Sequence, residues 1–179
     1  MKMVVGGYAG AGTITMGGYD YHTGDRATGE QRDFLAGQCI GACLNYAQRK
    51  KTPLMIYVFS DGAVSSNGRI DDSVGGGGKG EWTSDNSGTA ASFMLAFDPE
   101  TQPTVKTNQI GFFSSAGSVV TTSSPAANNP NLLVNTVLLN YLAFNKQEGR
   151  FDAIFDTLGI SHGLGAYSNL IAFDGATSL

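Results

Sequence analysis

The first sixty residues place one long amphipathic stretch between two short apolar or β-branched runs. Residues 13–16 (Thr-Ile-Thr-Met) alternate and are β-branched, which predicts a strand that ends at a glycine pair. Apolar residues then recur at 36, 40, 43, 44 and 47, the spacing of one face of a helix. The predicted helix, residues 30–50, has a capping box in Thr28 and Gln31 and stops before Pro53.

A continuous apolar run at residues 54–59 predicts a second strand. Both of its faces are apolar, which is typical of a strand covered on both sides. The order strand, helix, strand predicts a βαβ unit whose two strands are parallel. With a further short strand at 93–97, we predict an α/β fold: three layers, with a mostly parallel sheet and helices on both faces.

The rest of the chain is punctuated by glycine and proline. Residues 62–90 form a long polar segment that predicts a functional loop, and residues 110–122 predict a hairpin. Asn129 and Pro130 are the cap and first turn of another predicted helix. Its expected buried face consists of Leu133, Val137, Tyr141 and Phe144. We find no linker and expect one domain, residues 1–179.

Composition narrows the classes of function. Only 15% of the residues are charged and the net charge is −4, with the basic residues scattered, so we expect no nucleic-acid partner. The chain contains neither a run of transmembrane length nor a signal peptide, and we expect a soluble protein without a membrane span. Cys39 and Cys43 lie on adjacent helical turns and are expected to be small buried thiols.

Two candidate sites follow the predicted strands. Asp20 and His22, two residues apart in extended backbone, point to one side and would supply half of a metal site; the alternative is a solvated surface turn. Asp61 follows the apolar strand, where ligand-contacting residues of parallel sheets lie. It is a candidate metal ligand or general base; the alternative is an aspartate that starts the turn at Gly62.

The glycine-rich segment adds weaker candidates. Asp85 and Asn86 close it, as a further metal ligand and a candidate substrate contact. Lys79 and Trp82 are further candidate substrate contacts, although a single loop tryptophan is more often an anchor. His162 stands in a glycine-rich stretch with no carboxylate within several residues.

Several short motifs resemble one known family. Residues 16–23 (Met-Gly-Gly-Tyr-Asp-Tyr-His-Thr) are similar to a segment of the DUF1501 family of uncharacterised bacterial proteins, themselves similar to the alkaline phosphatase and sulfatase superfamily. The apolar strand ending in Phe-Ser-Asp-Gly and the segment 83–90 (Thr-Ser-Asp-Asn-Ser-Gly-Thr-Ala) follow in the same order. The likeness covers roughly residues 13–155, and related proteins have sometimes been labelled as secretion-pathway components.

The resemblance implies an alkaline-phosphatase-like fold and a divalent metal ion held by Asp20, His22, Asp61 and Asp85. The chain departs from the family in two ways: Asn86 stands where relatives carry histidine, and no strand before residue 13 holds a Ser or Thr nucleophile. We therefore expect either a piece of a longer, exported protein or a domain that has lost catalysis. A piece would show a broad apolar edge or face, or a dimer that hides one.

Three functions follow as hypotheses. The first is a metal-dependent hydrolase of phosphate or sulfate esters, acting on a small-molecule ester. The second is a non-catalytic binding or secretion-associated module, and the third is a structural remnant without a site. For a metal site, His22 is the ligand on which we expect binding to depend most, with Asp61 as its partner and Asn86 as a weak oxygen donor. So few imidazoles would admit Mg or Ca in place of Zn.

Overall fold

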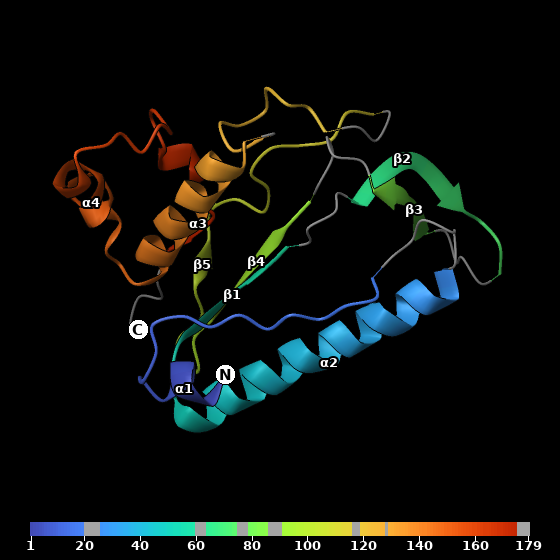
Figure 1. The fold of residues 1–179 in the computed structure, drawn as a ribbon, viewed down its shortest axis with the longest axis horizontal. Helices are drawn as coiled ribbons and strands as arrows, with labels where there is room; N and C mark the ends of the chain where they lie inside the picture. The colour runs from blue at the N-terminus through green and yellow to red at the C-terminus, as the bar shows by residue number, and fades with distance from the viewer. Residues whose placement is uncertain are drawn as a thin grey trace.

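The computed structural model describes residues 1–19, 26–59, 64–74, 79–85, 91–115, 119–127 and 129–174, with backbone only for Arg26 and for residues 64–71 and 79–85. Its elements follow in chain order (Figure 1). They are α1 (Lys2–Val5), α2 (Arg26–Lys50), β1 (Leu54–Val58), β2 (Val64–Asp71), β3 (Lys79–Asp85), β4 (Phe93–Phe97), β5 (Thr104–Val105), α3 (Pro130–Phe144), the 3-10 turn η1 (Glu148–Arg150), α4 (Phe151–Leu158), the 3-10 turn η2 (Ser168–Leu170) and β6 (Phe173–Asp174).

Helix α2 confirms the predicted long helix, and its face is the predicted one. Cys43 and Ala47 are buried and Ala36, Ile40 and Leu44 are half-buried, whereas the intervening Gln38, Asn45 and Gln48 are exposed. The helix begins at Arg26, so Thr28 lies inside its first turn and does not form the predicted capping box. Beyond its end, Lys51 adopts a left-handed φ of 52° before the chain turns into β1.

The predicted parallel sheet is wrong. β1 is a strand, as expected, but it pairs antiparallel with β4, from Leu54 opposite Phe97 to Val58 opposite Phe93. Within the described residues the strands form three separate two-stranded antiparallel sheets, β1–β4, β2–β3 and β5–β6. The alkaline-phosphatase-like, three-layer arrangement with a mostly parallel sheet is therefore not the fold of this chain.

Residues 13–16 do not form the predicted first strand. They are extended but carry no ladder, and Ile14 and Met16 are exposed. A strand is stabilised by its neighbour, and a β-branched run of four residues without a partner gains little from its propensity alone. Since this strand is absent, the predicted βαβ unit does not exist. The segment ends at Gly18, whose φ of 84° is left-handed.

The long polar segment contains a hairpin that the sequence did not predict. β2 and β3 pair antiparallel, with register shifts around Ser66. Val64 lies opposite Asp85, and beyond the interruption Val58 lies opposite Phe93. The two pairs are almost equally centred in the sequence, so β1–β4 and β2–β3 follow one another in the chain as the two described ladders of one long hairpin. We call the residues that join the two ladders, 59–63 and 86–92, the break.

The described core lies in the carboxyl-terminal third, where α3, α4 and residues 164–171 meet. α3 begins as predicted: the Asn129 side chain accepts a hydrogen bond from the N–H of Leu132 at 3.1 Å, and Pro130 occupies the first turn. Its buried face differs from the prediction, because Tyr141 is exposed. The core cluster comprises Leu139, Leu142, Ala143, Phe151, Phe155, Leu164, Leu170 and Ile171.

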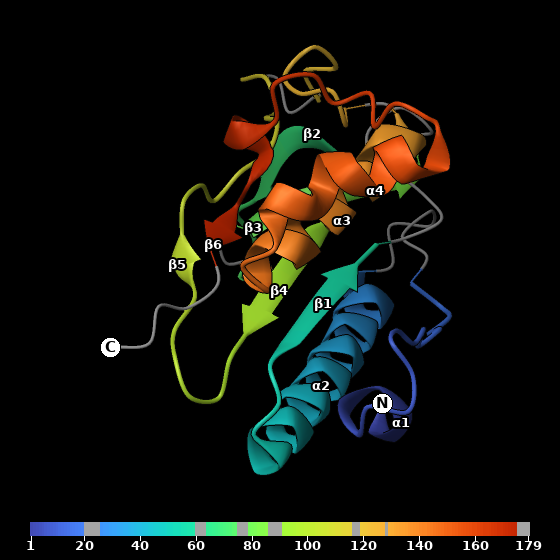
Figure 2. The same ribbon diagram turned by 90° about the vertical axis from the view of Figure 1, so that its left-hand side faces the viewer.

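The predicted hairpin at 110–122 is confirmed in outline by an antiparallel bridge between Phe113 and Val119. The N–H of Val120 also donates to the carbonyl of Phe112 at 2.9 Å. Figure 2 shows α3 and α4 crossing above β1 and β4, with α2 on the other side of this pair of strands. In the part of the chain that the structure describes, no helix has the length and apolar character needed to span a membrane.

Candidate functional site

The principal predicted ligands fall largely outside the described residues. Asp20, His22, Asp61 and Asn86 lie there, so the structure does not test their convergence. Asp85 is the last residue of β3, and its backbone pairs with that of Val64. Asp85 is thus the last residue of its strand before the break in the long hairpin.

Chain connectivity links the two acidic segments. Residues 59–63 join β1 to β2, and residues 86–92 join β3 to β4. Both segments therefore connect the same two ladders, one ending at Val58 and Phe93 and the other at Val64 and Asp85.

The segment that leads to Asp20 approaches α2. A Cβ added at Gly18 would lie 3.0 Å from the Nε of Arg32, so the backbone here lies against the guanidinium group of a residue in the second turn of the helix. α2 runs back alongside β1, which brings the start of the helix and the end of β1 to the same side of the molecule (Figures 1 and 2). Residues 20–25 join Tyr19 to Arg26 in the chain.

The weaker candidates Lys79 and Trp82 lie on β3 at different distances from Asp85. Lys79 lies opposite Asp71 at the closed end of the β2–β3 hairpin, and Trp82 lies opposite Ser66 in its middle. Six strand steps separate Lys79 from Asp85, or about 20 Å at 3.3 Å per residue. The backbone positions of Lys79 and Asp85 are therefore far apart along β3.

His162 is held by three neighbouring elements. Its Nε2 lies 3.4 Å from a carboxylate oxygen of Asp152, and its Nδ1 accepts a hydrogen bond from the N–H of Leu164 at 3.0 Å. Its own carbonyl accepts from the Asn135 side chain at 2.8 Å. The Nδ1 is therefore occupied by a hydrogen bond, while the Nε2 faces the Asp152 carboxylate.

An aromatic cluster encloses the same histidine. The rings of Phe151, Phe155 and Tyr167 lie with centroids 5.1, 5.8 and 5.3 Å from that of His162. Tyr167 donates its hydroxyl to Asp152 at 3.0 Å. Burial, the hydrogen bond and the charge of Asp152 together raise the pKa of Tyr167. Sequence spacing did not reveal this cluster, because Asp152 lies on α4, a helix that the sequence did not predict.

No metal centre is assembled within the described residues, where no group of three or more His, Cys, Asp or Glu side chains comes together. The two cysteines do not supply one. Cys43 is buried and Cys39 half-buried, and both are free thiols. Burial, with a contribution from Cys39, raises the pKa of Cys43 and favours the protonated thiol over the thiolate that binds metals.

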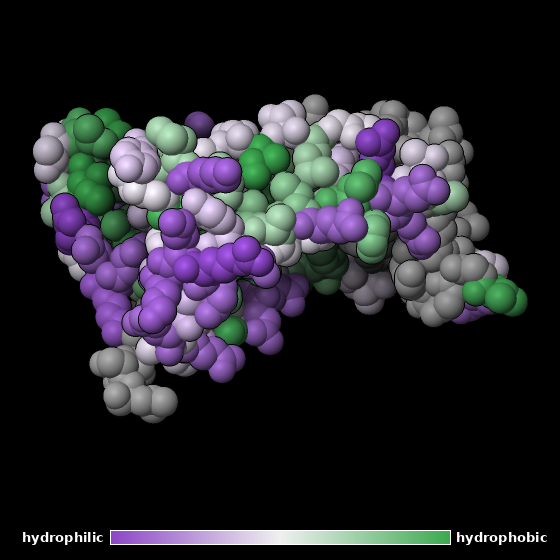
Figure 3. Space-filling model, turned by 90° about the horizontal axis from the view of Figure 1, so that it is seen from below, coloured by the Kyte–Doolittle hydropathy of each residue, from purple (hydrophilic) through white to green (hydrophobic). Residues whose placement is uncertain are grey.

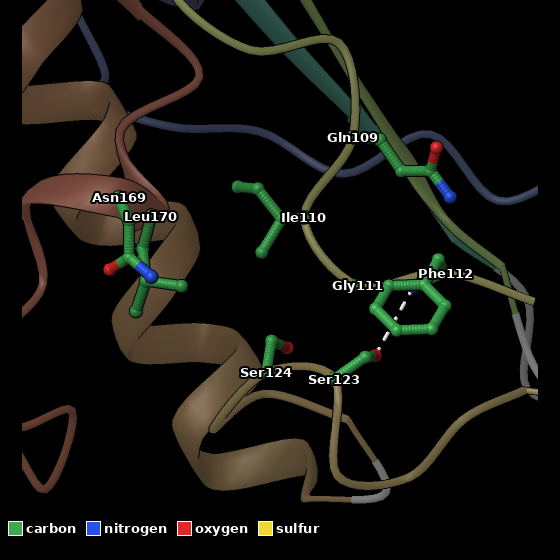
Figure 4. A pocket seen from close by; sticks show the side chains of 8 residues that line it. All are labelled: Gln109, Ile110, Gly111, Phe112, Ser123, Ser124, Asn169 and Leu170. Carbon is green, nitrogen blue, oxygen red and sulfur yellow. Dashed lines mark hydrogen bonds between the residues drawn. The ribbon is translucent and has the colours of Figure 1, made fainter.

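A shallow hollow lies beside the carboxyl-terminal core (Figure 4). It has a volume of about 240 Å³ and is lined by neutral residues from two loops and from η2, among them Ile110, Phe112, Ser124 and Asn169. The Ser123 hydroxyl accepts from the N–H of Phe112 at 3.1 Å and closes one side. The lining offers no carboxylate, imidazole or cation, so it is unsuited to metal binding or acid–base catalysis.

Comparison of the chain with protein-family models, with curated proteins and with solved structures gives no match. The DUF1501 resemblance therefore rests on the short motifs around Asp20, Asp61 and Asp85.

Proposed function

We propose that this chain binds a divalent metal ion through Asp20, His22, Asp61 and Asp85, and that it uses the ion to hydrolyse phosphate or sulfate esters. The main support for this proposal is the pairing of the strands on either side of the break in the long hairpin. The pairings of Val58 with Phe93 and of Val64 with Asp85 tether the Asp61 and Asp85 segments to the same two ladders. Asp61 lies in the chain three residues after Val58 and three residues before Val64, the residue that pairs with Asp85. This connectivity supports a shared site for the two aspartates.

The position of α2 supports the contribution of Asp20 and His22. These residues lie between Tyr19 and Arg26 in the sequence, and the start of α2 and the end of β1 lie on the same side of the molecule (Figure 2). Six residues join those two described positions, so the segment can extend toward the break without moving α2. The antiparallel pairing of β1 changes the sheet around the proposed site but not the order of its ligands in the chain.

The donor set suits a divalent cation. Three carboxylates and one imidazole provide enough negative charge and one nitrogen ligand, and Asn86 offers a further neutral oxygen. A bound divalent ion polarises the ester oxygen and lowers the pKa of a water ligand. Asp20, His22, Asp61 and Asp85 would hold the ion, and the proton of that water would pass to solvent.

Metal content tests the proposal directly. The full chain is purified without chelators and its bound metal measured, with turnover of p-nitrophenyl phosphate and p-nitrophenyl sulfate in parallel. We expect close to one divalent ion per chain, and we expect His22→Ala to lose most of it. His162→Gln is the matched control, because the His162 nitrogens are engaged by Asp152 and Leu164. Equal metal content in the wild-type and His22→Ala proteins would contradict the proposed site.

A second candidate function is a non-catalytic binding or secretion-associated module, which the exposed apolar side chains favour. Phe34 and Leu35 on α2 are exposed, as is Phe59 after β1. Figure 3 shows hydrophobic residues reaching the surface between hydrophilic ones on the face seen from below. Bound metal without turnover of either ester would favour this function over the hydrolase.

A further inference from the structure

The contacts of the His162 ring require one particular protonation state. The N–H of Leu164 donates to Nδ1 at 3.0 Å, and a nitrogen that accepts a hydrogen bond carries no proton. The proton of the neutral ring therefore sits on Nε2, which faces a carboxylate oxygen of Asp152 at 3.4 Å. Both contacts suit this tautomer, because Nδ1 then accepts and the N–H of Nε2 points to an anion.

Protonation of the ring conflicts with one of these contacts. Both nitrogens of an imidazolium donate and neither accepts, so the N–H of Leu164 would meet a second N–H and lose its acceptor. Leu164 is buried in the carboxyl-terminal core. Little of this residue reaches water, so water can replace the lost acceptor only after the backbone around it has moved.

The other surroundings of the ring suit the protonated form or are neutral. On α4, the Asp152 carboxylate is the charged group beside Nε2, and it also accepts a hydrogen bond from the titratable hydroxyl of Tyr167 at 3.0 Å. A charged donor binds a carboxylate more strongly than a neutral one does. The rings of Phe151, Phe155 and Tyr167 hold the imidazole in place. The protonated ring is therefore expected to stay beside Asp152, and the Leu164 bond to break.

The backbone after His162 is suited to such a movement. Gly163 and Gly165 have left-handed φ angles of 72° and 64°, and glycine changes φ at a smaller steric cost than other residues. On the α3 side the contact is neutral: the Asn135 amide donates to the His162 carbonyl at 2.8 Å and fixes the start of the turn. Loss of the Leu164 bond would thus free residues 163–165 while His162 itself remains held.

We propose that His162 makes the turn at residues 162–165 sensitive to pH. In the neutral state Nδ1 accepts from Leu164 and the turn is closed. As the pH falls from about 8 to about 5, the range in which histidine side chains change charge, Nδ1 takes a proton from solvent. The ring then keeps Asp152 and releases the N–H of Leu164, so the turn opens. The proton returns to solvent when the pH rises, and the turn closes again.

The tautomer of His162 is the first test. The ¹⁵N shifts of both ring nitrogens are measured by NMR on the full, ¹⁵N-labelled chain between pH 8 and pH 5. The chain contains two histidines, and His22→Gln assigns the His162 signals by removing the others. At pH 8 we expect a protonated Nε2 and an accepting Nδ1, and at pH 5 two protonated nitrogens. A proton on Nδ1 at pH 8, or a ring that stays neutral down to pH 5, overturns the proposal.

Hydrogen exchange of the Leu164 amide tests the opening itself. After correction for the intrinsic effect of pH on exchange, its rate should rise about fivefold or more from pH 8 to pH 5. The Ala172 amide, which donates to buried Asn140, should change less than about twofold. His162→Gln, whose amide does not titrate, should abolish the response of Leu164, whereas the matched variant His22→Gln should retain it. Circular dichroism verifies that both variants fold.

Asp152→Asn tests the role of the carboxylate. It removes the charge that favours the protonated ring, so the response of Leu164 should move to lower pH. A Leu164 amide whose exchange does not respond while His162 takes up its proton overturns the proposal. A response that persists in His162→Gln overturns it as well, because another group would then open the turn.

Discussion

The buried side chain of Asn140 accepts a hydrogen bond from the backbone N–H of Ala172 at 2.7 Å, across 32 residues of sequence. Its amide nitrogen donates to the carbonyls of Thr136 and Leu170, at 2.9 and 2.8 Å. Asn140 is fully buried, so these bonds form away from water. One residue of α3 thus fixes the carboxyl-terminal segment that leads into β6.

Removing this side chain should be strongly destabilising. Asn140→Ala leaves the N–H of Ala172 and the carbonyl of Leu170 without partners, at about 1–3 kcal/mol for each buried group. We expect a loss of roughly 2–5 kcal/mol in the free energy of unfolding, measured by urea denaturation. Asn145→Ala is the control, because its amide also donates to the carbonyl four residues earlier, at 2.7 Å, but in an exposed position. A loss below about 1 kcal/mol is expected there, and equal losses would contradict the assigned role of Asn140.

The left-handed residue after α2 offers a stabilising substitution. The N–H of Thr52 donates to the carbonyl of Ala47 and that of Lys51 to the carbonyl of Gln48, the two bonds of a Schellman motif. Lys51 occupies the position that favours glycine, with φ 52°. Lys51→Gly should therefore raise the free energy of unfolding by about 0.5–1 kcal/mol.

Lys50 provides the control for that substitution. It is the last residue of α2 and has helical geometry, so Lys50→Gly should lower stability by up to about 1 kcal/mol. α4 ends in the same motif with Gly159 at φ 67°, and Gly159→Ala should lower stability by about 1 kcal/mol. Thermal denaturation of the three variants measures all these shifts. A stabilising Lys50→Gly or a destabilising Lys51→Gly would contradict the cap geometry.

Local signals predicted part of the fold. The apolar spacing in α2 and the Asn129 cap of α3 depend on residues within two turns of one another, so the sequence displays them directly. The buried face of α3 was mispredicted because Leu132, Leu133, Val134, Leu138 and Leu139 make the helix apolar nearly all round. The exposure of Tyr141 and the burial of Asn140 therefore depend on contacts with residues elsewhere in the chain.

Strand pairing could not be predicted in the same way. Two-sided apolar character identified β1 but did not give its partner, which lies about forty residues later. Polar composition hid β2 and β3, whose ladder contains few apolar residues and is irregular around Ser66. Of the candidate site, the sequence identified residue types and spacing. Whether the side chains of Asp20, His22, Asp61 and Asp85 come together depends on segments outside the described residues. That prediction is tested by the measurement of bound metal.

Asp98 should contribute to the acid limb of stability. The N–H groups of Glu100 and Thr101 donate to its carboxylate at 2.9 and 3.2 Å. These bonds, that of Glu100 first, lower the pKa of Asp98 below its ordinary value of 3.8. A lowered pKa contributes stability above the unfolded value, and this contribution is lost as the pH falls through the folded value.

Asp98→Asn tests this contribution, because it removes the titrating group and keeps an oxygen acceptor. We expect stability near pH 7 to fall by less than about 1 kcal/mol, since this exposed turn retains its hydrogen bonds. The slope of unfolding free energy against pH below 4 should become flatter than in the wild type. Unchanged slopes in urea titrations at pH 2–5 would show that Asp98 carries none of the acid sensitivity.

The last prediction concerns the alkaline limb and Tyr167. Burial, first, and then the hydrogen bond and charge of Asp152 raise the pKa of Tyr167 above its ordinary value of 10.0. The unfolded chain therefore loses this proton first, so the contribution of Tyr167 is present below pH 10 and is lost as the pH rises through the folded value. Tyr167→Phe keeps the ring against Phe151 and His162 but removes the hydroxyl, so stability at pH 7 should fall by about 0.5–1.5 kcal/mol and the decline above pH 9 should become shallower. Tyr141→Phe, which removes an exposed hydroxyl on α3, is the matched control and should leave both quantities within error. An alkaline limb that is equally steep in wild type and Tyr167→Phe would show that the Tyr167–Asp152 bond does not persist in solution.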